Sequence, residues 1–124
     1  MKETEVIAIL HTPGNDIVNQ TTGIYNSENN TIEYYETDID KTLVKFDFNN
    51  NILYRSNDNI EMEYHFEENR NSKNKVTIKG MEQTLLVSIF TTKILKDDKY
   101  IYIKYQVIDA KEECAFEIKY EEVQ

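Results

Sequence analysis

Apolar and polar residues alternate in short stretches along most of this chain. In Asn59–Glu67 and Lys99–Ile108 an apolar residue occupies at least every second position. Successive side chains of a β-strand point to opposite faces, so this period of two is typical of a half-buried strand. The pattern predicts ten strands: Glu3–Thr12, Asp16–Tyr25, Thr31–Thr37, Thr42–Phe48, Ile52–Ser56, Asn59–Glu67, Lys75–Gly80, Thr84–Leu95, Tyr100–Ile108 and Cys114–Glu121.

Short polar segments rich in asparagine separate these stretches. Ser27–Asn30, Asn49–Asn51, Ser56–Asn59 and Asp109–Glu112 are short enough for hairpin turns. The chain has three glycines, and asparagine is the residue that otherwise tolerates the positive φ of such turns. We therefore expect an antiparallel meander. The longest polar stretch, Glu67–Asn74, is predicted to be a solvated loop.

The segment Met81–Leu95 fits two patterns. Leu85, Leu86, Ile89, Phe90 and Ile94 also lie near helical spacing. The segment is rich in Val, Ile, Phe and Thr, whose stiff or bulky side chains suit a pleated sheet better than a helix. We predict a long strand and keep a helix as the alternative.

On several strands the alternation separates an apolar face from a charged one. One such face carries Thr42, Val44, Phe46 and Phe48, and another carries Cys114, Phe116, Ile118 and Tyr120. A sheet with one dry face must curl over that face or pack it on a second layer, and closure also removes exposed edges. The sequence therefore predicts an all-β, antiparallel up-and-down meander closed into a barrel of about 8–10 strands.

Length and composition narrow the class of protein. A chain of 124 residues fits a single domain, 1–124, with a core that needs no disulfide. The single cysteine, Cys114, fits a reducing compartment. The N-terminus lacks the pattern of a signal peptide, and no apolar run approaches the length of a membrane span. We expect an acidic cytoplasmic protein that binds neither nucleic acid nor membranes, since its net charge is −9.

Several segments in order resemble a known family. They are Thr21–Tyr25, Ile32–Glu36, Thr42–Lys45, Arg55-Ser56, Met62 to Phe66, Leu85–Thr91 and Ile101–Tyr105. Together they resemble the uncharacterised YwiB-like proteins of bacteria, also grouped as DUF1934, over most of the chain after the first hairpin. The resemblance implies a calycin-like, or lipocalin-like, antiparallel barrel and no defined activity.

One constellation could carry chemistry. Ile32, Tyr34 and Glu36 share one strand face, and Arg55 shares a face with the apolar Leu53. If both faces turn inward, Glu36 and Arg55 can form an ion pair beside the Tyr34 hydroxyl. Such a pair is costly in a core unless it is fully hydrogen-bonded. It would then anchor the polar end of a ligand or exchange a proton. The structural alternative is an ion pair that closes a strand end.

Nine tyrosines and no tryptophan suggest a second feature of the interior. Tyrosines can line a pocket that has apolar walls and polar tips, although tyrosine is also a good strand residue. We predict ligand contacts at Tyr34, Glu36, Arg55, Phe46, Met62 and Tyr105. We predict no metal site and no cofactor, because His11 and His65 lie on different strands and phosphate-binding or hydrolase motifs are absent. No residue is assigned a catalytic role.

Three functions remain open. The first is a non-enzymatic barrel that binds a small, partly apolar molecule in its interior. The second is an interaction or structural barrel with a filled core. The third is a small enzyme that uses Tyr34, Glu36 and Arg55 on an acidic or phenolic substrate. The sequence leaves the ligand, the oligomeric state and the pathway open.

Overall fold

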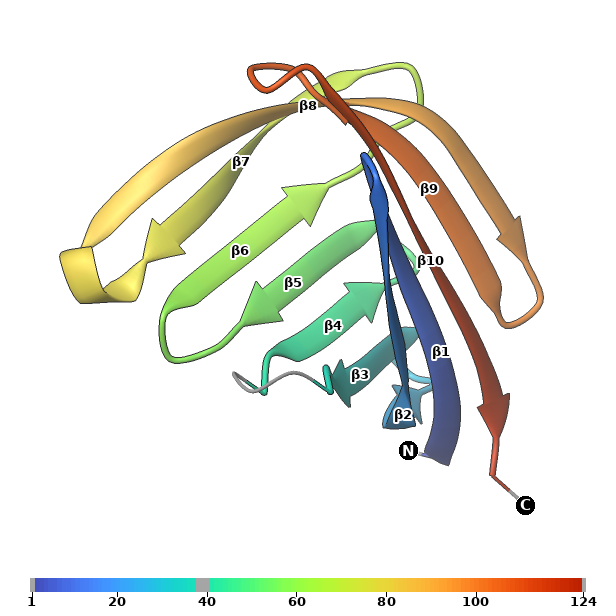
Figure 1. Cartoon of the computed structure of the whole chain (residues 1–124). Coiled ribbons are helices and arrows are strands. Elements are labelled where there is room, and N and C mark those ends of the chain that lie inside the picture. Colours follow the sequence, from blue (N-terminus) through green and yellow to red (C-terminus); the bar gives the residue numbers. More distant parts are fainter. Residues whose placement is uncertain (1, 38–40, 124) are drawn as a thin grey trace.

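The computed structural model describes residues 2–37 and 41–123, and these form a closed antiparallel barrel (Figure 1). Its elements are β1 (Lys2–Thr12), β2 (Asn15–Asn26), β3 (Thr31–Tyr35), β4 (Leu43–Asp47), β5 (Ile52–Ser56), β6 (Ile60–His65), β7 (Asn71–Ile78), the 3-10 turn η1 (Lys79–Met81), β8 (Gln83–Asp97), β9 (Tyr100–Val107) and β10 (Glu112–Glu122). Neighbours in sequence pair, and β1 pairs with β10 to close the ring. The predicted all-β barrel is confirmed.

Asparagine makes several of the turns, as the composition predicted. Asn30, Asn51 and Asn69 have positive φ angles of 54°, 55° and 62°. Before the β4–β5 turn, Asp47 Oδ1 accepts hydrogen bonds from the backbone N–H groups of Asn49 and Asn50, at 2.9 and 3.2 Å. Side chains that hydrogen-bond the local backbone hold such turns without glycine.

The structure corrects one prediction and excludes one alternative that the sequence left around β7 and β8. The expected loop Glu67–Asn74 is wrong at its end, because β7 begins at Asn71. The buried Asn74 explains the error: its side chain accepts from the His65 N–H at 2.8 Å and donates to the Val87 carbonyl at 3.2 Å. A polar residue therefore sits in the sheet. The helical alternative for Met81–Leu95 is also wrong, since β8 is a strand and Gly80 lies in η1.

The inward faces of the strands meet in one apolar cluster. Phe46 is 0% exposed, and its ring contacts Phe48 and Phe116 with centroids 5.0 and 5.4 Å apart. Phe66 adds a contact to Phe116 at 5.6 Å. Aromatic pairs of this kind each stabilise a core by about 0.5–1.5 kcal/mol beyond the area that they bury. The faces predicted around Phe46 and Phe116 do form the core.

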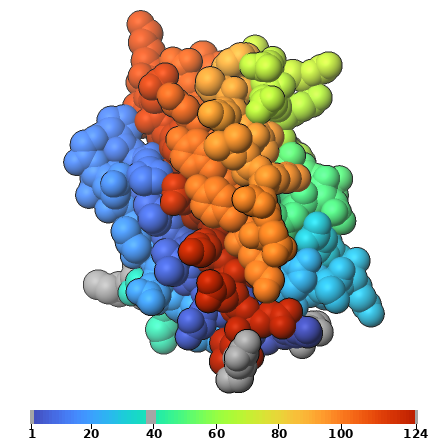
Figure 2. All heavy atoms as spheres, turned by 90° about the vertical axis from the view of Figure 1, so that its right-hand side faces the viewer, coloured from blue at the N-terminus to red at the C-terminus, as the bar shows by residue number. Residues whose placement is uncertain are grey.

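One end of the barrel is closed by side chains, and we call it the sealed end. There Tyr25 stacks on Tyr120 with ring centroids 5.2 Å apart, and Phe48 packs on Tyr120 at 5.6 Å. Lys96 Nζ donates to the Phe48 carbonyl at 2.6 Å. Figure 2 shows the side of the molecule where the β8–β9 hairpin (orange) and β10 (red) cover the surface beside the blue β1–β2 residues.

At the opposite end, which we call the open end, the sheet loses part of its pairing. Among the described residues, β2 pairs with β3 over Ile24–Asn26, and β8 pairs with β9 from Ile89 onward. The segment Gln83–Val87 consequently pairs with β7 alone. Leu85 has the inward position next to Val76 but is 41% exposed. The interior is therefore accessible at this end and closed at the other.

No helix in 2–37 or 41–123 is both long and apolar enough to cross a membrane.

Candidate functional site

Glu36 and Arg55 meet inside the barrel near its open end. Glu36 directly follows β3, two residues after the buried Tyr34, and Arg55 lies on β5 two residues after the buried Leu53. Arg55 Nη2 donates to Glu36 Oε1, and the two side chains are 31% and 11% exposed. The ion pair that the strand faces predicted is thus present.

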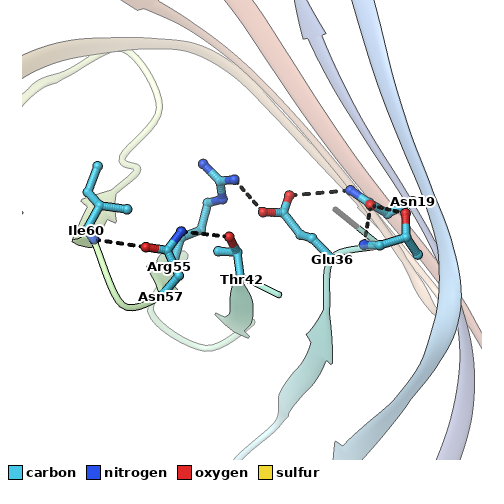
Figure 3. Close-up of polar contacts among 7 residues, drawn as sticks. Asn19, Glu36, Thr42, Arg55, Asn57 and Ile60 are labelled. Carbon is cyan, nitrogen blue, oxygen red and sulfur yellow. Dashed lines mark hydrogen bonds and ion pairs between the residues drawn. The ribbon is translucent and has the colours of Figure 1, made fainter. Parts of the chain in front are cut away.

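Backbone and turn contacts fix the position of Glu36 (Figure 3). The Glu36 N–H donates to the Thr42 carbonyl at 2.8 Å, which closes the chain between β3 and β4. Asn57 Nδ2 donates to Thr42 Oγ1 at 3.0 Å, and Asn57 Oδ1 accepts from the Ile60 N–H at 2.9 Å. The β5–β6 turn therefore supports the segment that carries the carboxylate.

Asn19 on β2 completes the site, and sequence reasoning missed it. Its Nδ2 donates to Glu36 Oε2 at 3.4 Å, and its Oδ1 accepts from the Thr37 N–H and the Thr37 hydroxyl, both at 3.0 Å. Asn19 is buried opposite Ala8 of β1. An asparagine at an inward position of an amphipathic strand was the available signal, but a single polar residue does not name its partner.

A row of inward residues crosses the sheet beside the ion pair. Each is the register partner of the next, from strand to strand: Tyr34, Val44, Arg55, Met62, Val76 and Leu85. The row begins at a buried tyrosine and ends at the exposed Leu85. Arg55 is the charged member of this row, so its guanidinium lies between a dry interior and an apolar, solvent-accessible rim.

A small cavity of about 40 Å³ lies next to the ion pair. Asn19, Tyr34, Glu36 and Arg55 line it on one side, and residues of β1 and β10 that include Phe116 line it on another. Since a single water needs about 10–15 Å³, this space suits one or two waters and is too small for an organic ligand. A ligand of that size would have to lie above the cavity, at the open end.

The other predicted ligand contacts lie at different depths. Phe46 is fully buried in the aromatic cluster, whereas Met62 is half-buried beside Arg55. Tyr105 is buried, with its ring centroid 5.2 Å from that of Phe66 and 6.4 Å from that of Tyr64. These three residues do not line the cavity. Of them, Met62 is the one that the structure brings next to the ion pair.

The tyrosines around the ion pair are held in their neutral form. Burial raises the pKa of Tyr34 well above its usual value, and the Glu36 carboxylate raises it further while Arg55 opposes this. Burial likewise raises the pKa of Tyr64 and of Tyr105, again opposed by Arg55. A neutral hydroxyl donates and accepts hydrogen bonds but does not serve as a base at neutral pH.

His11, His65 and Cys114 do not line the small cavity, although His11 contacts Glu117, which does. His11 contacts Asp16 and Glu117 at 2.9 and 3.3 Å, and the hydrogen bond with Asp16 contributes most to a raised histidine pKa. Cys114 is buried, and burial raises the pKa of its thiol. Within the described part of the chain, no cluster of three or more His, Cys, Asp or Glu could hold a metal ion.

Larger hollows lie on the outer surface. One of about 600 Å³ runs along the outside where β2 meets β3 and includes Gly23, Ile24, Tyr35 and Leu43. Gly23 is required there, because a Cβ atom at this position would overlap the Glu33 carbonyl oxygen. The hollow thus follows from a close approach of two strands and is separate from the ion pair.

Comparison with known proteins supports the fold. Neither a family model nor a curated protein matches this sequence. The crystal structure of the ywiB protein from Bacillus subtilis matches with a TM-score of 0.68 and 23% identity, over 98% of this chain and 91% of that one. The resemblance to YwiB-like proteins is therefore confirmed in the fold, whereas membership of the DUF1934 family stays a prediction.

Proposed function

We propose that this barrel is a non-enzymatic binding protein that holds a small, partly apolar molecule at its open end. The polar anchor is Arg55, and the apolar contacts come from the row that ends at Leu85. The ligand carries a neutral hydrogen-bond acceptor such as a carbonyl or hydroxyl oxygen, because Glu36 already balances the charge of Arg55 and would repel a second anion.

The observation that carries the proposal is the exposure of an inward-facing arginine. Arg55 Nη2 donates a hydrogen bond to Glu36, yet the Arg55 side chain remains 31% exposed. A guanidinium has five N–H donors, so donors remain for a ligand. Met62 flanks Arg55 in register, and Leu85 provides exposed apolar surface at the end of the same row. Apolar walls with few convergent polar groups are typical of ligand sites.

The small cavity sets the mode of binding. Sites that enclose a ligand usually measure about 300–1,000 Å³, and the space beside the ion pair measures about 40 Å³. We therefore expect the ligand to rest on the open end with part of its surface in water. Such a complex should be weak and should form and dissociate quickly.

A filled-core interaction barrel is the second candidate, and a specific observation favours it. The cluster of Phe46, Phe66 and Phe116 occupies the interior with direct ring contacts. The enzyme hypothesis is less well supported, because both Glu36 oxygens already accept hydrogen bonds, from Arg55 and Asn19. A proton transfer by Glu36 would first have to break that arrangement.

Titration with prodan, a neutral naphthyl ketone whose fluorescence reports polarity and hydrogen bonding, tests the proposal. We expect the wild-type protein to bind prodan with a blue-shifted emission. Arg55→Met should weaken binding about tenfold, because a hydrogen bond from a charged donor is worth about 1.5–3 kcal/mol. Arg70→Met is the matched control, since Arg70 is exposed and pairs with Glu67 on a loop.

The Arg55 variant leaves Glu36 without its partner, so folding must be checked. The double variant Glu36→Gln/Arg55→Met removes both charges, and Arg55→Lys keeps the cation. Circular dichroism would confirm that each is folded before titration. The proposal fails if folded Arg55→Met and Arg70→Met bind prodan equally well, or if the wild-type protein does not bind it.

A further inference from the structure

The strand β8 has a free backbone edge at the open end. Its pairing with β9 begins at Ile89, and the last contact toward β9 is the Ile108 N–H donating to the Ser88 carbonyl at 3.0 Å. The backbone groups of alternate residues of a strand point to the same side. Those of Thr84 and Leu86 therefore point the same way as those of Ser88, where the described part of the chain provides no strand to receive them.

This edge lacks the usual protection against pairing. From Gln83 to Thr92 the sequence contains no charged residue and no proline. Leu85 and Leu86 lie on opposite faces and are 41% and 61% exposed, and Met81 in η1 is 70% exposed. Native proteins normally blunt exposed edge strands with charges, proline or bulges. An unprotected edge with apolar residues on both faces is suited to receive another strand.

The charge around this edge indicates the kind of strand. The whole chain has 14 basic and 23 acidic residues. The β7–β8 hairpin, residues 71–97, reverses that balance, with Lys73, Lys75, Lys79, Lys93 and Lys96 against Glu82 and Asp97. Lys73 and Lys75 are register partners of Ser88 and Leu86, so they lie one strand away from the free edge. None of these lysines forms an ion pair within the described residues.

We propose that the free edge of β8 at Thr84–Leu86 binds an extended acidic segment of another protein by strand addition. Backbone hydrogen bonds to Thr84 and Leu86 hold the segment, and its apolar residues pack on Leu85 on the inner face. Acidic side chains on the outer face reach Lys73 and Lys75. A second copy of this chain is a poorer occupant, because it would bring the same lysines to the contact.

Fluorescence anisotropy with a labelled seven-residue peptide of alternating glutamate and valine tests this site. We expect it to bind, and the matching lysine–valine peptide to bind at least tenfold more weakly. Leu86→Pro should abolish binding, because it removes an N–H that points to the free edge, whereas the N–H groups that face β7 stay in place. Leu86→Thr keeps that N–H and should retain most of the binding.

The lysines have their own matched test. Lys73→Gln/Lys75→Gln should weaken binding of the acidic peptide at least fivefold. Lys111→Gln/Lys119→Gln removes two exposed lysines elsewhere and should leave binding unchanged. Amide hydrogen exchange adds a readout by residue: the Thr84 and Leu86 amides should exchange quickly in the free protein and become protected with the peptide.

Three results would overturn the proposal. The first is that neither peptide binds, or that Leu86→Pro leaves binding unchanged. The second is that the Thr84 and Leu86 amides are already protected in the free protein. The third is that sedimentation shows a dimer that Leu86→Pro dissociates, since the occupant would then be a second copy.

Discussion

The two ends of this barrel differ in how they treat inward-facing residues. At the sealed end, Tyr25, Phe48 and Tyr120 pack ring on ring, and Lys96 ties β8 to the Phe48 carbonyl. At the open end, the row of inward residues ends at the exposed Leu85. The same row contains the charged Arg55, two strands before Val76. The same alternating sequence pattern thus produces packing at one end and an accessible surface at the other.

The difference separates residues that stabilise the fold from residues that are available for binding. A fully packed aromatic cluster gives rigidity, because interiors are as dense as organic crystals. The inward Arg55 pairs with Glu36, which also accepts a hydrogen bond from Asn19. Such an ion pair adds little net stability, since the desolvation of its charges offsets much of their attraction. We therefore expect substitutions at the sealed end and in the core to change stability, and substitutions at the open end to change binding.

The largest expected effect is a loss of unfolding free energy when a buried side chain is truncated, and two variants allow it to be compared between the core and the open end. Phe46→Ala should lower the free energy of unfolding by about 3–5 kcal/mol, because the ring is completely buried and leaves a cavity. Met62→Ala should cost about 1–2 kcal/mol, because Met62 is half-buried and water can reach part of the space. Urea denaturation measures both. Equal losses would contradict the distinction between the packed interior and the open end.

Two glycines provide the next comparison. Gly23→Ala should lower stability by about 1–3 kcal/mol, because its Cβ would collide with the Glu33 carbonyl where β2 meets β3. Gly80→Ala should be neutral or should stabilise by up to about 1 kcal/mol, because nothing lies within 4 Å of that Cβ. Thermal unfolding of the two variants checks the sign. A destabilised Gly80→Ala would show that the hairpin tip is more tightly constrained than we describe.

The smallest expected effect is a change in how stability falls with pH in the alkaline range. Burial raises the pKa of Tyr120 to about 12, from an ordinary value of 10, and Tyr25 adds to the shift. The folded state therefore holds the Tyr120 proton more tightly than the unfolded state does. The contribution of Tyr120 to the free energy of unfolding is fully present below pH 10 and is lost as the pH rises from 10 to about 12. Tyr120→Phe should flatten the fall of stability with pH in that window.

Tyr35→Phe is the control for the alkaline experiment, because Tyr35 is 59% exposed. Stability at several pH values between 9 and 12 would be measured by urea denaturation. If Tyr35→Phe flattens the curve as much as Tyr120→Phe does, burial at the sealed end is not the cause.

Much of the fold could be predicted from the sequence because a period of two is a local signal. The ten strands and the inward faces of Phe46 and Phe116 were predicted from alternation alone. The start of β7 was missed because Asn74 is polar and buried, and its hydrogen bonds to His65 and Val87 come from strands on both sides. A local pattern does not contain such partners.

The candidate site was predictable in part for the same reason. The inward positions of Glu36 and Arg55 followed from their neighbours Tyr34 and Leu53. Asn19 was not predicted, because its hydrogen bond to Glu36 depends on where β2 separates from β3. The free edge of β8 was likewise not predictable, since it depends on the length of β9 relative to β8.

The most direct test of the binding proposal maps prodan onto the protein by NMR with 15N-labelled material. We predict shifts of the Asn19 side-chain amide and of the Met62 and Leu85 backbone amides, with Phe48 and Lys99 unchanged. Shifts confined to Ile24 and Tyr35, which line the outer hollow, or to the sealed end would contradict a binding site at the open end.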